Sequence, residues 1–189
     1  MPATHCDAPA RPTVWAPADD VVLRDGTPVR MRPIRRTDLE LERRFVNALS
    51  SRTRYLRLLS ARTLLPGELE RWTDIDPARE IAWVAVTGEG DGERELGVAR
   101  CIRDDANPAI WDFAIVIGDA WQHLGLGRAL LGRLMACAAR AGVERLSSVT
   151  LSENHAMLSL ARRLGFSTRR EPLDATLTRV ERRLDGWVD

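Results

Sequence analysis

Residues 113–128 read FAIVIGDAWQHLGLGR, an apolar run at 113–117 followed by a loop whose last six residues, 122–127, contain two glycines. The apolar part predicts a strand, and the segment after the loop repeats apolar residues at helical spacing. Gly125 and Gly127 lie at the junction, where glycine permits backbone conformations and close approaches that other residues resist. The unpaired N–H groups of the first helical turn point back into such a loop. Together with the helix dipole and Arg128, they predict a phosphate or pyrophosphate site.

Two other phosphate-binding loops fit this stretch less well. A P-loop requires Gly-Lys-Ser/Thr, a tripeptide that the chain lacks. A dinucleotide-binding loop requires a third small residue where Leu130 stands. A plain strand-to-helix turn without a ligand is the third interpretation.

Composition limits the class of protein. The 189 residues, 44% of them hydrophobic and 29% charged, suit one globular domain, which we expect over residues 21–189 after a flexible tail at 1–20. The net charge of +1 argues against nucleic-acid and membrane partners. No apolar run predicts a membrane span or a signal peptide, and the three cysteines have no metal-binding spacing. We therefore expect a cytoplasmic protein without a metal.

All 28 cationic residues are arginine, and the sequence contains no lysine. Codon bias in a GC-rich genome is the simpler explanation, and protection of a lysine-modifying enzyme from self-acylation is the alternative.

The remaining pattern predicts an α/β domain with a mixed, mostly antiparallel central sheet and helices on both faces. An Asp-Gly turn joins two strands, and Thr37 with Glu40 predicts a capping box at the start of a helix. Expected strands cover residues 21–23, 29–34, 81–86, 95–102, 109–117, 145–151, 166–170 and 175–184. Expected helices cover residues 37–50, 53–59, 66–75, 128–141 and 154–164.

The Q-x-x-G-x-G pattern of residues 122–127 resembles the acyl-CoA loop of the GNAT superfamily of N-acetyltransferases. Residues 154–166, N-x-x-M-x-x-L-A-x-R-L-G-F, resemble a second motif of that superfamily at the expected distance downstream. The resemblance implies the GNAT fold, in which two neighbouring strands splay apart and the arm of acetyl-CoA enters between them. Residues 23–26, 32–35, 50–57, 79–80 and 153–166 also resemble the acetyltransferase domain of bacterial protein lysine acetyltransferases.

The resemblance also implies cofactor-binding residues. Main-chain groups of Ile115, Val116 and Ile117 would hold the pantetheine arm, and Asn154 would approach the pantetheine or the thiolate. The residues expected to hold the pyrophosphate are Gln122, His123, Leu124, Gly125, Leu126, Gly127 and Arg128.

Asp112 is the candidate general base, because it is the one charged residue of an apolar strand and burial would raise its pKa. A solvated position at the exposed start of the strand is the alternative. Glu80 and Glu153 are secondary candidates. Ala161 stands where many GNAT enzymes place a tyrosine that protonates the thiolate, and the chain's one tyrosine is Tyr55.

We therefore expect an acetyl-CoA-dependent N-acetyltransferase in which the amine attacks the bound thioester directly. A protein lysine is the first candidate acceptor and a small amine the second. A non-catalytic module that binds acyl-CoA is the alternative from another class. The resemblance also implies a homodimer as a candidate assembly.

Overall fold

The structure, a computed structural model, describes residues 18–58 and 67–185, so most of the expected tail at 1–20 lies outside the described residues. The first strand begins at Asp19, two residues earlier than expected. Asp19 pairs with Met31 in the sheet and forms an ion pair with Arg133. These two contacts extend the strand beyond its apolar residues.

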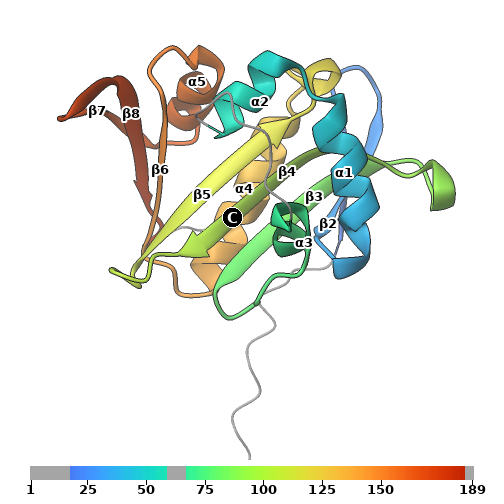
Figure 1. Cartoon of the computed structure of the whole chain (residues 1–189), viewed down its shortest axis with the longest axis horizontal. Coiled ribbons are helices and arrows are strands. Elements are labelled where there is room, and N and C mark those ends of the chain that lie inside the picture. Colours follow the sequence, from blue (N-terminus) through green and yellow to red (C-terminus); the bar gives the residue numbers. More distant parts are fainter. Residues whose placement is uncertain (1–17, 59–66, 186–189) are drawn as a thin grey trace, which may run out of the picture.

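Eight strands form one sheet in the order β1-β2-β3-β4-β5-β6-β8-β7 (Figure 1). All neighbouring strands are antiparallel except β5 and β6, which are parallel. The strands are β1 (Asp19–Val22), β2 (Pro28–Pro33), β3 (Glu80–Thr87), β4 (Arg94–Arg103), β5 (Ile110–Ile117), β6 (Arg145–Leu151), β7 (Ser167–Glu171) and β8 (Asp174–Arg183). The mixed, mostly antiparallel sheet predicted from the sequence is thereby confirmed.

Helices cover both faces of the sheet, with α1 and α3 on one side and α4 on the other (Figure 1). Alternate strand residues divide between the two layers: Val84 and Val116 pack with the α1 side, whereas Trp83 and Phe113 pack with α4. The helical segments are η1 (Arg36–Asp38), α1 (Leu39–Ala48), α2 (Ser51–Leu58), α3 (Glu68–Thr73), η2 (Gly90–Gly92), η3 (Asp119–Trp121), α4 (Leu126–Arg140) and α5 (His155–Arg163).

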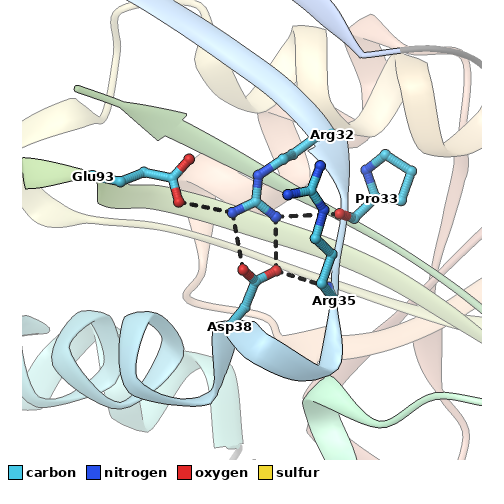
Figure 2. A network of polar contacts seen from close by, with 5 residues as sticks. All are labelled: Arg32, Pro33, Arg35, Asp38 and Glu93. Atoms are coloured by element: carbon cyan, nitrogen blue, oxygen red, sulfur yellow. Dashed lines mark hydrogen bonds and ion pairs between the residues drawn. The ribbon is translucent and has the colours of Figure 1, made fainter. Parts of the chain in front are cut away.

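The capping box expected at Thr37 and Glu40 is wrong, because α1 starts after Asp38. The buried Arg32 guanidinium donates to both carboxylate oxygens of Asp38 at 2.7 and 2.9 Å, and the Arg35 N–H donates to the same group at 2.7 Å (Figure 2). Arg32 also reaches Glu93 at 2.9 Å. A local backbone contact from Arg35 and the ion pairs of Arg32, of which the one with Glu93 spans 61 positions, therefore fix this helix start.

Candidate functional site

The sheet opens between β5 and β6. These strands pair over three residue pairs, from Ile110↔Arg145 to Asp112↔Ser147. Beyond Asp112, β5 continues to pair with β4 through Ile117, whereas β6 turns away towards β8 (Figure 1). The β6-facing edge of β5 therefore has no strand partner after Asp112. Backbone polar groups require hydrogen-bond partners, so this edge suits a ligand that carries amides.

The loop after β5 contains several backbone N–H groups that have no hydrogen-bond partner among the described residues. No backbone N–H from His123 to Gly127 donates to a partner in the part of the chain that the structure describes. His123 and Gly125 have left-handed backbone conformations, with φ of 64° and 98°. Gly125 precedes the 15-residue helix α4 without a side-chain cap. Consecutive free N–H groups at a helix N-terminus bind anions, so these residues fit a pyrophosphate.

Contacts with neighbouring elements support the shape of the loop. The Gln122 amide donates to the Ile117 carbonyl at 3.1 Å, which ties the loop to the end of β5. The Leu124 carbonyl accepts the Arg24 N–H at 3.2 Å, so the β1–β2 turn supports the loop from the other side. A Cβ on Gly127 would lie 3.4 Å from Leu160, because α4 and α5 pack closely there.

The other expected loop residues differ in exposure. Leu126 is fully buried, so only its main chain is available, whereas His123 and Arg128 are exposed. Along β5, Val116 is buried on the α1 side. Ile115 and Ile117 are partly buried on the α4 side. These packed side chains leave the main chain of β5 as the part that can meet a ligand.

Asn154 caps α5, at the start of the helix that the sequence predicts over residues 154–164. Its side-chain oxygen accepts the Met157 N–H at 3.1 Å, and its NH₂ group donates to the Thr150 hydroxyl at 3.1 Å. Both ends of the amide are therefore engaged within the protein, and a contact with the pantetheine stays a prediction.

Asp112 lies at the apex of the opening, in the last residue pair that joins β5 to β6. Its side chain is exposed. Partial burial and then the Asp104 carboxylate raise the pKa of Asp112, and Arg179 offsets part of this increase. Asp112 is thus exposed near the start of its strand and also has a raised pKa. The sequence offered these two properties as alternatives.

The secondary candidates lie in different places. Glu80 pairs with Ile102, which in turn pairs with Asp112, so both acidic residues occupy one row and one face of the sheet. Burial raises the pKa of Glu80, and Arg100 opposes that increase. Glu153 lies beyond the end of β6, where Arg52 forms an ion pair with it at 3.1 Å. Of these two, Glu80 shares a face with Asp112.

Sequence reasoning missed Asp119, which joins α2 to the site. Its carboxylate accepts the Ser50 N–H at 2.9 Å and the hydroxyls of Ser50 and Thr53, both at 2.7 Å. Burial alone would raise the pKa of Asp119, but the hydrogen bonds from Ser50 and Thr53 outweigh it and lower that pKa. The spacing Ser50-x-x-Thr53 is a local capping signal, but nothing local indicates an acceptor more than 60 residues away.

Residues 18–58 and 67–185, the part of the chain that the structure describes, lack two features. Within these ranges, no group of three or more His, Cys, Asp or Glu residues could hold a metal ion. No helix in the same ranges is long and apolar enough to span a bilayer. Ala161, at the position of the missing tyrosine, is fully buried.

Comparison with known proteins gives consistent results. The family described as "Acetyltransferase (GNAT) domain" matches residues 29–167. The chain is 38% identical over 159 residues to "Acetyltransferase PA5475" of Pseudomonas aeruginosa, a match that covers 82% of this chain and 83% of the relative. It is 32% identical over 161 residues to "Acetyltransferase Pat" of Mycolicibacterium smegmatis, covering 85% of this chain but 48% of that longer protein.

Solved structures show the same similarity. The GNAT domain of S. lividans PAT superimposes with a TM-score of 0.78 at 27% identity, covering 92% of this chain and 99% of that domain. The Salmonella typhimurium protein yncA, described as a putative acetyltransferase with its cofactor acetyl-CoA, superimposes with a TM-score of 0.67 at 21% identity. That alignment covers 85% of this chain and 96% of yncA, and it bears on the fold alone.

Proposed function

This chain belongs to the GNAT acetyltransferase family, and from that premise we propose that it acetylates a protein lysine with Asp112 as general base. As a member of this family, the chain is an acyl-CoA N-acyltransferase that uses acetyl-CoA. The observation that supports the proposal is the juxtaposition of two features: the free N–H groups of residues 123–127 and the unpartnered edge of β5. One suits a pyrophosphate, and the other suits the amides of a pantetheine arm.

In this proposal the chain's residues divide the work of binding. Residues 123–127 hold the pyrophosphate through main-chain N–H groups, with Arg128 adding positive charge at the same helix end. Gln122 keeps the loop on the end of β5 through the Ile117 carbonyl. The free edge of Ile115, Val116 and Ile117 receives the pantetheine, and Asn154 fixes the turn from β6 into α5 on the opposite wall.

Asp112 receives the proton of the attacking amine in this mechanism. An amine attacks only when neutral, so a base with a raised pKa favours the reaction near neutral pH. The exposed carboxylate lies where the opening between β5 and β6 begins, and a water can bridge it to the amine. Acetyl-CoA supplies the activated acetyl group, and the thiolate that leaves takes a proton from water. The resemblance of residues 50–57 and 153–166 to bacterial protein lysine acetyltransferases supports a protein acceptor.

Release of CoA tests the proposal with wild type, Asp112→Ala and Asp112→Asn, using lysine peptides and small amines as acceptors. Loss of the base should lower turnover roughly tenfold or more while the affinity for acetyl-CoA, measured by calorimetry, stays unchanged. Turnover that persists in both variants would contradict the role of Asp112 and point to Glu80 or to water.

A pH profile sharpens the test, because Asp104 contributes to the raised pKa of Asp112. A base acts when deprotonated, so the rate should fall as the pH drops through its pKa. Asp104→Asn should therefore shift the acidic limb of the profile to lower pH. Asp105→Asn is the matched control, since Asp105 pairs with Arg79, and it should leave that limb in place.

The buried Ala161 favours one alternative, a module that binds acyl-CoA without turnover. A tyrosine that would protonate the thiolate is absent there. Tight binding of acetyl-CoA without CoA release, across protein and small-amine acceptors alike, would support that alternative. Turnover with small amines but not peptides would instead make a small amine the acceptor.

A further inference from the structure

Helix α2 bridges the open end of the gap between β5 and β6. Asp119 follows the end of β5, and Glu153 follows the end of β6. The first turn of α2 reaches both of them: the Thr53 hydroxyl donates to Asp119 at 2.7 Å, and the Arg52 guanidinium lies 3.1 Å from Glu153. The diverging strands are thus joined again at their far ends by one helical turn.

The two attachments differ in strength. Asp119 accepts three hydrogen bonds from Ser50 and Thr53, and an ionised acceptor makes such bonds stronger than neutral ones. Glu153 is held by one ion pair whose side chains are 59% and 54% exposed, and pairs of this kind are weak and screened by salt. The β5 side of α2 is therefore the fixed end, and the β6 side can open.

Helix α2 also contacts the anion loop. The Gln122 amide lies 3.5 Å from the Thr53 hydroxyl and donates to the Ile117 carbonyl at 3.1 Å. Thr53 thus connects Asp119, α2 and the residue that holds the loop on β5. A shift of α2 would therefore disturb the end of β5, next to the N–H groups of residues 123–127.

We propose that the first turn of α2 is a strap across the pantetheine arm of bound acyl-CoA, with Asp119 as its positioning residue and Arg52–Glu153 as its closing contact. The inference rests on the proposed function. A ligand with its pyrophosphate at residues 123–127 and its thioester near Asp112 must lie along the free edge of β5. Its arm then passes through the gap that α2 bridges, and the Arg52–Glu153 pair opens when CoA leaves.

Dissociation of CoA, followed by stopped-flow displacement, tests the closing contact. Arg52→Ala and Glu153→Gln should each speed dissociation roughly twofold to fivefold, the range that an exposed ion pair supports. The double variant should be no faster than either single one, because both remove the same contact. Arg30→Ala is the matched control, because it breaks an exposed pair with Asp20 that lies between β1 and β2, away from the turn through which Arg24 contacts Leu124.

A shortened ligand distinguishes a contact of α2 with the pantetheine arm from a general support of the anion loop by α2. The nucleotide half of CoA, 3′-phospho-ADP, carries the pyrophosphate but no pantetheine, so its dissociation should be the same in wild type and in the Arg52 and Glu153 variants. Asp119→Asn keeps one oxygen for the two hydroxyls, so CoA dissociation should increase in the order wild type, Asp119→Asn, Asp119→Ala.

The outcomes distinguish the two proposals. Equal acceleration of CoA and 3′-phospho-ADP would overturn the strap, since α2 would then only support the loop. Unchanged CoA dissociation in the Arg52 and Glu153 variants would overturn it as well, with the acetyl-CoA site intact. Wild type that binds neither ligand would contradict the proposed function itself.

Discussion

Glu42 of α1 and Glu95 of β4 form a buried carboxyl pair beneath α1. Their exposed fractions are 1% and 7%, and Glu42 Oε2 and both Glu95 oxygens have no hydrogen-bond partner among the described residues. Burial, and then the charge of Glu42, raise the pKa of Glu95 well above its usual value. Burial also raises the pKa of Glu42, against the opposing charges of Arg100 and Arg57. The pair therefore retains a proton that two separate carboxyls would lose.

This pair should make stability depend on pH. A carboxyl with a raised pKa binds its proton more tightly in the folded state, so its stabilisation is complete below about pH 4.5, near the unfolded pKa. It is then lost as the pH rises through the folded pKa. Glu95→Gln removes this titration and should exceed wild type by about 1–2 kcal/mol in unfolding free energy at pH 8, with near equality at pH 4.5.

Urea denaturation at the two pH values measures this difference. Glu40→Gln is the control, because Glu40 lies on the exposed face of the same helix. A Glu95→Gln protein that is less stable than wild type by the same amount at both pH values would refute a shared, pH-dependent proton.

Ala161 illustrates how packing limits a residue's chemistry. It is fully buried between α5 and the main core, so a tyrosine there has no free volume in this chain. Ala161→Tyr should therefore destabilise the fold by about 1–3 kcal/mol through overpacking and should not increase turnover. Thermal unfolding measures the change in stability of this variant, and CoA release measures its turnover. A stable Ala161→Tyr variant with faster turnover would show that the missing tyrosine limits the reaction.

At the scale of elements, the Arg32 network joins β2, the start of α1 and the segment before β4 (Figure 2). Burial alone would lower the pKa of Arg32, but the hydrogen bonds to Asp38 and Glu93 outweigh it and raise that pKa. Arg32→Met leaves the buried Asp38 carboxylate without its main partner, and breaking such a pair costs about 3–5 kcal/mol. Chemical denaturation should show a loss of that size.

The double variant Arg32→Met/Asp38→Leu tests the cause. It removes both charges of the buried pair, so it should recover part of the stability that Arg32→Met loses. Arg30→Ala, which breaks an exposed pair on the same strand, should change stability by less than about 0.5 kcal/mol. A double variant less stable than Arg32→Met would mean that packing, not the unpaired charge, explains the loss.

The elements that the sequence predicts well are those whose signal is local. Strand β5, the loop and helix α4 follow one another within 31 residues, and Asn154 caps α5 as its position indicates. The start of α1 differs from the expectation because Asp38, and not Thr37, is the residue held in place, by the Arg35 N–H and by the Arg32 guanidinium of β2. The contacts of α2 have no local signal, since its partners Asp119 and Glu153 lie 66 and 101 positions away from Thr53 and Arg52.

At the scale of the whole molecule, the sheet order turns distant segments into one site. The parallel contact of β5 with β6 covers three residue pairs, whereas β6 pairs with β8 along its full length. The gap therefore comes from topology: β5 keeps its antiparallel partner β4, and β6 keeps β8. The edge of β5 with its loop, the strand β6 and the helix α2 meet at this gap, although they come from three separate parts of the chain.

The whole chain offers no lysine amine, and this has a chemical consequence for an acetyltransferase. All 28 of its cationic side chains are arginines, which stay protonated and do not attack thioesters. Cys101 and Cys137 are buried, and burial raises the pKa of the Cys101 thiol, which disfavours the thiolate. Stable self-acetylation is therefore confined to the α-amino group of the first residue.

Intact mass spectrometry after incubation with excess acetyl-CoA should show at most one stable acetyl group per chain, following hydroxylamine treatment to remove thioesters. Arg30→Lys supplies the control, because it places one exposed amine on the β1–β2 hairpin without changing the charge. A chemical acetylating reagent should modify that variant at one more site than wild type. Two or more stable acetyl groups on wild type would contradict the argument, because the attacking atom would then be one that a lysine-free chain is not expected to supply.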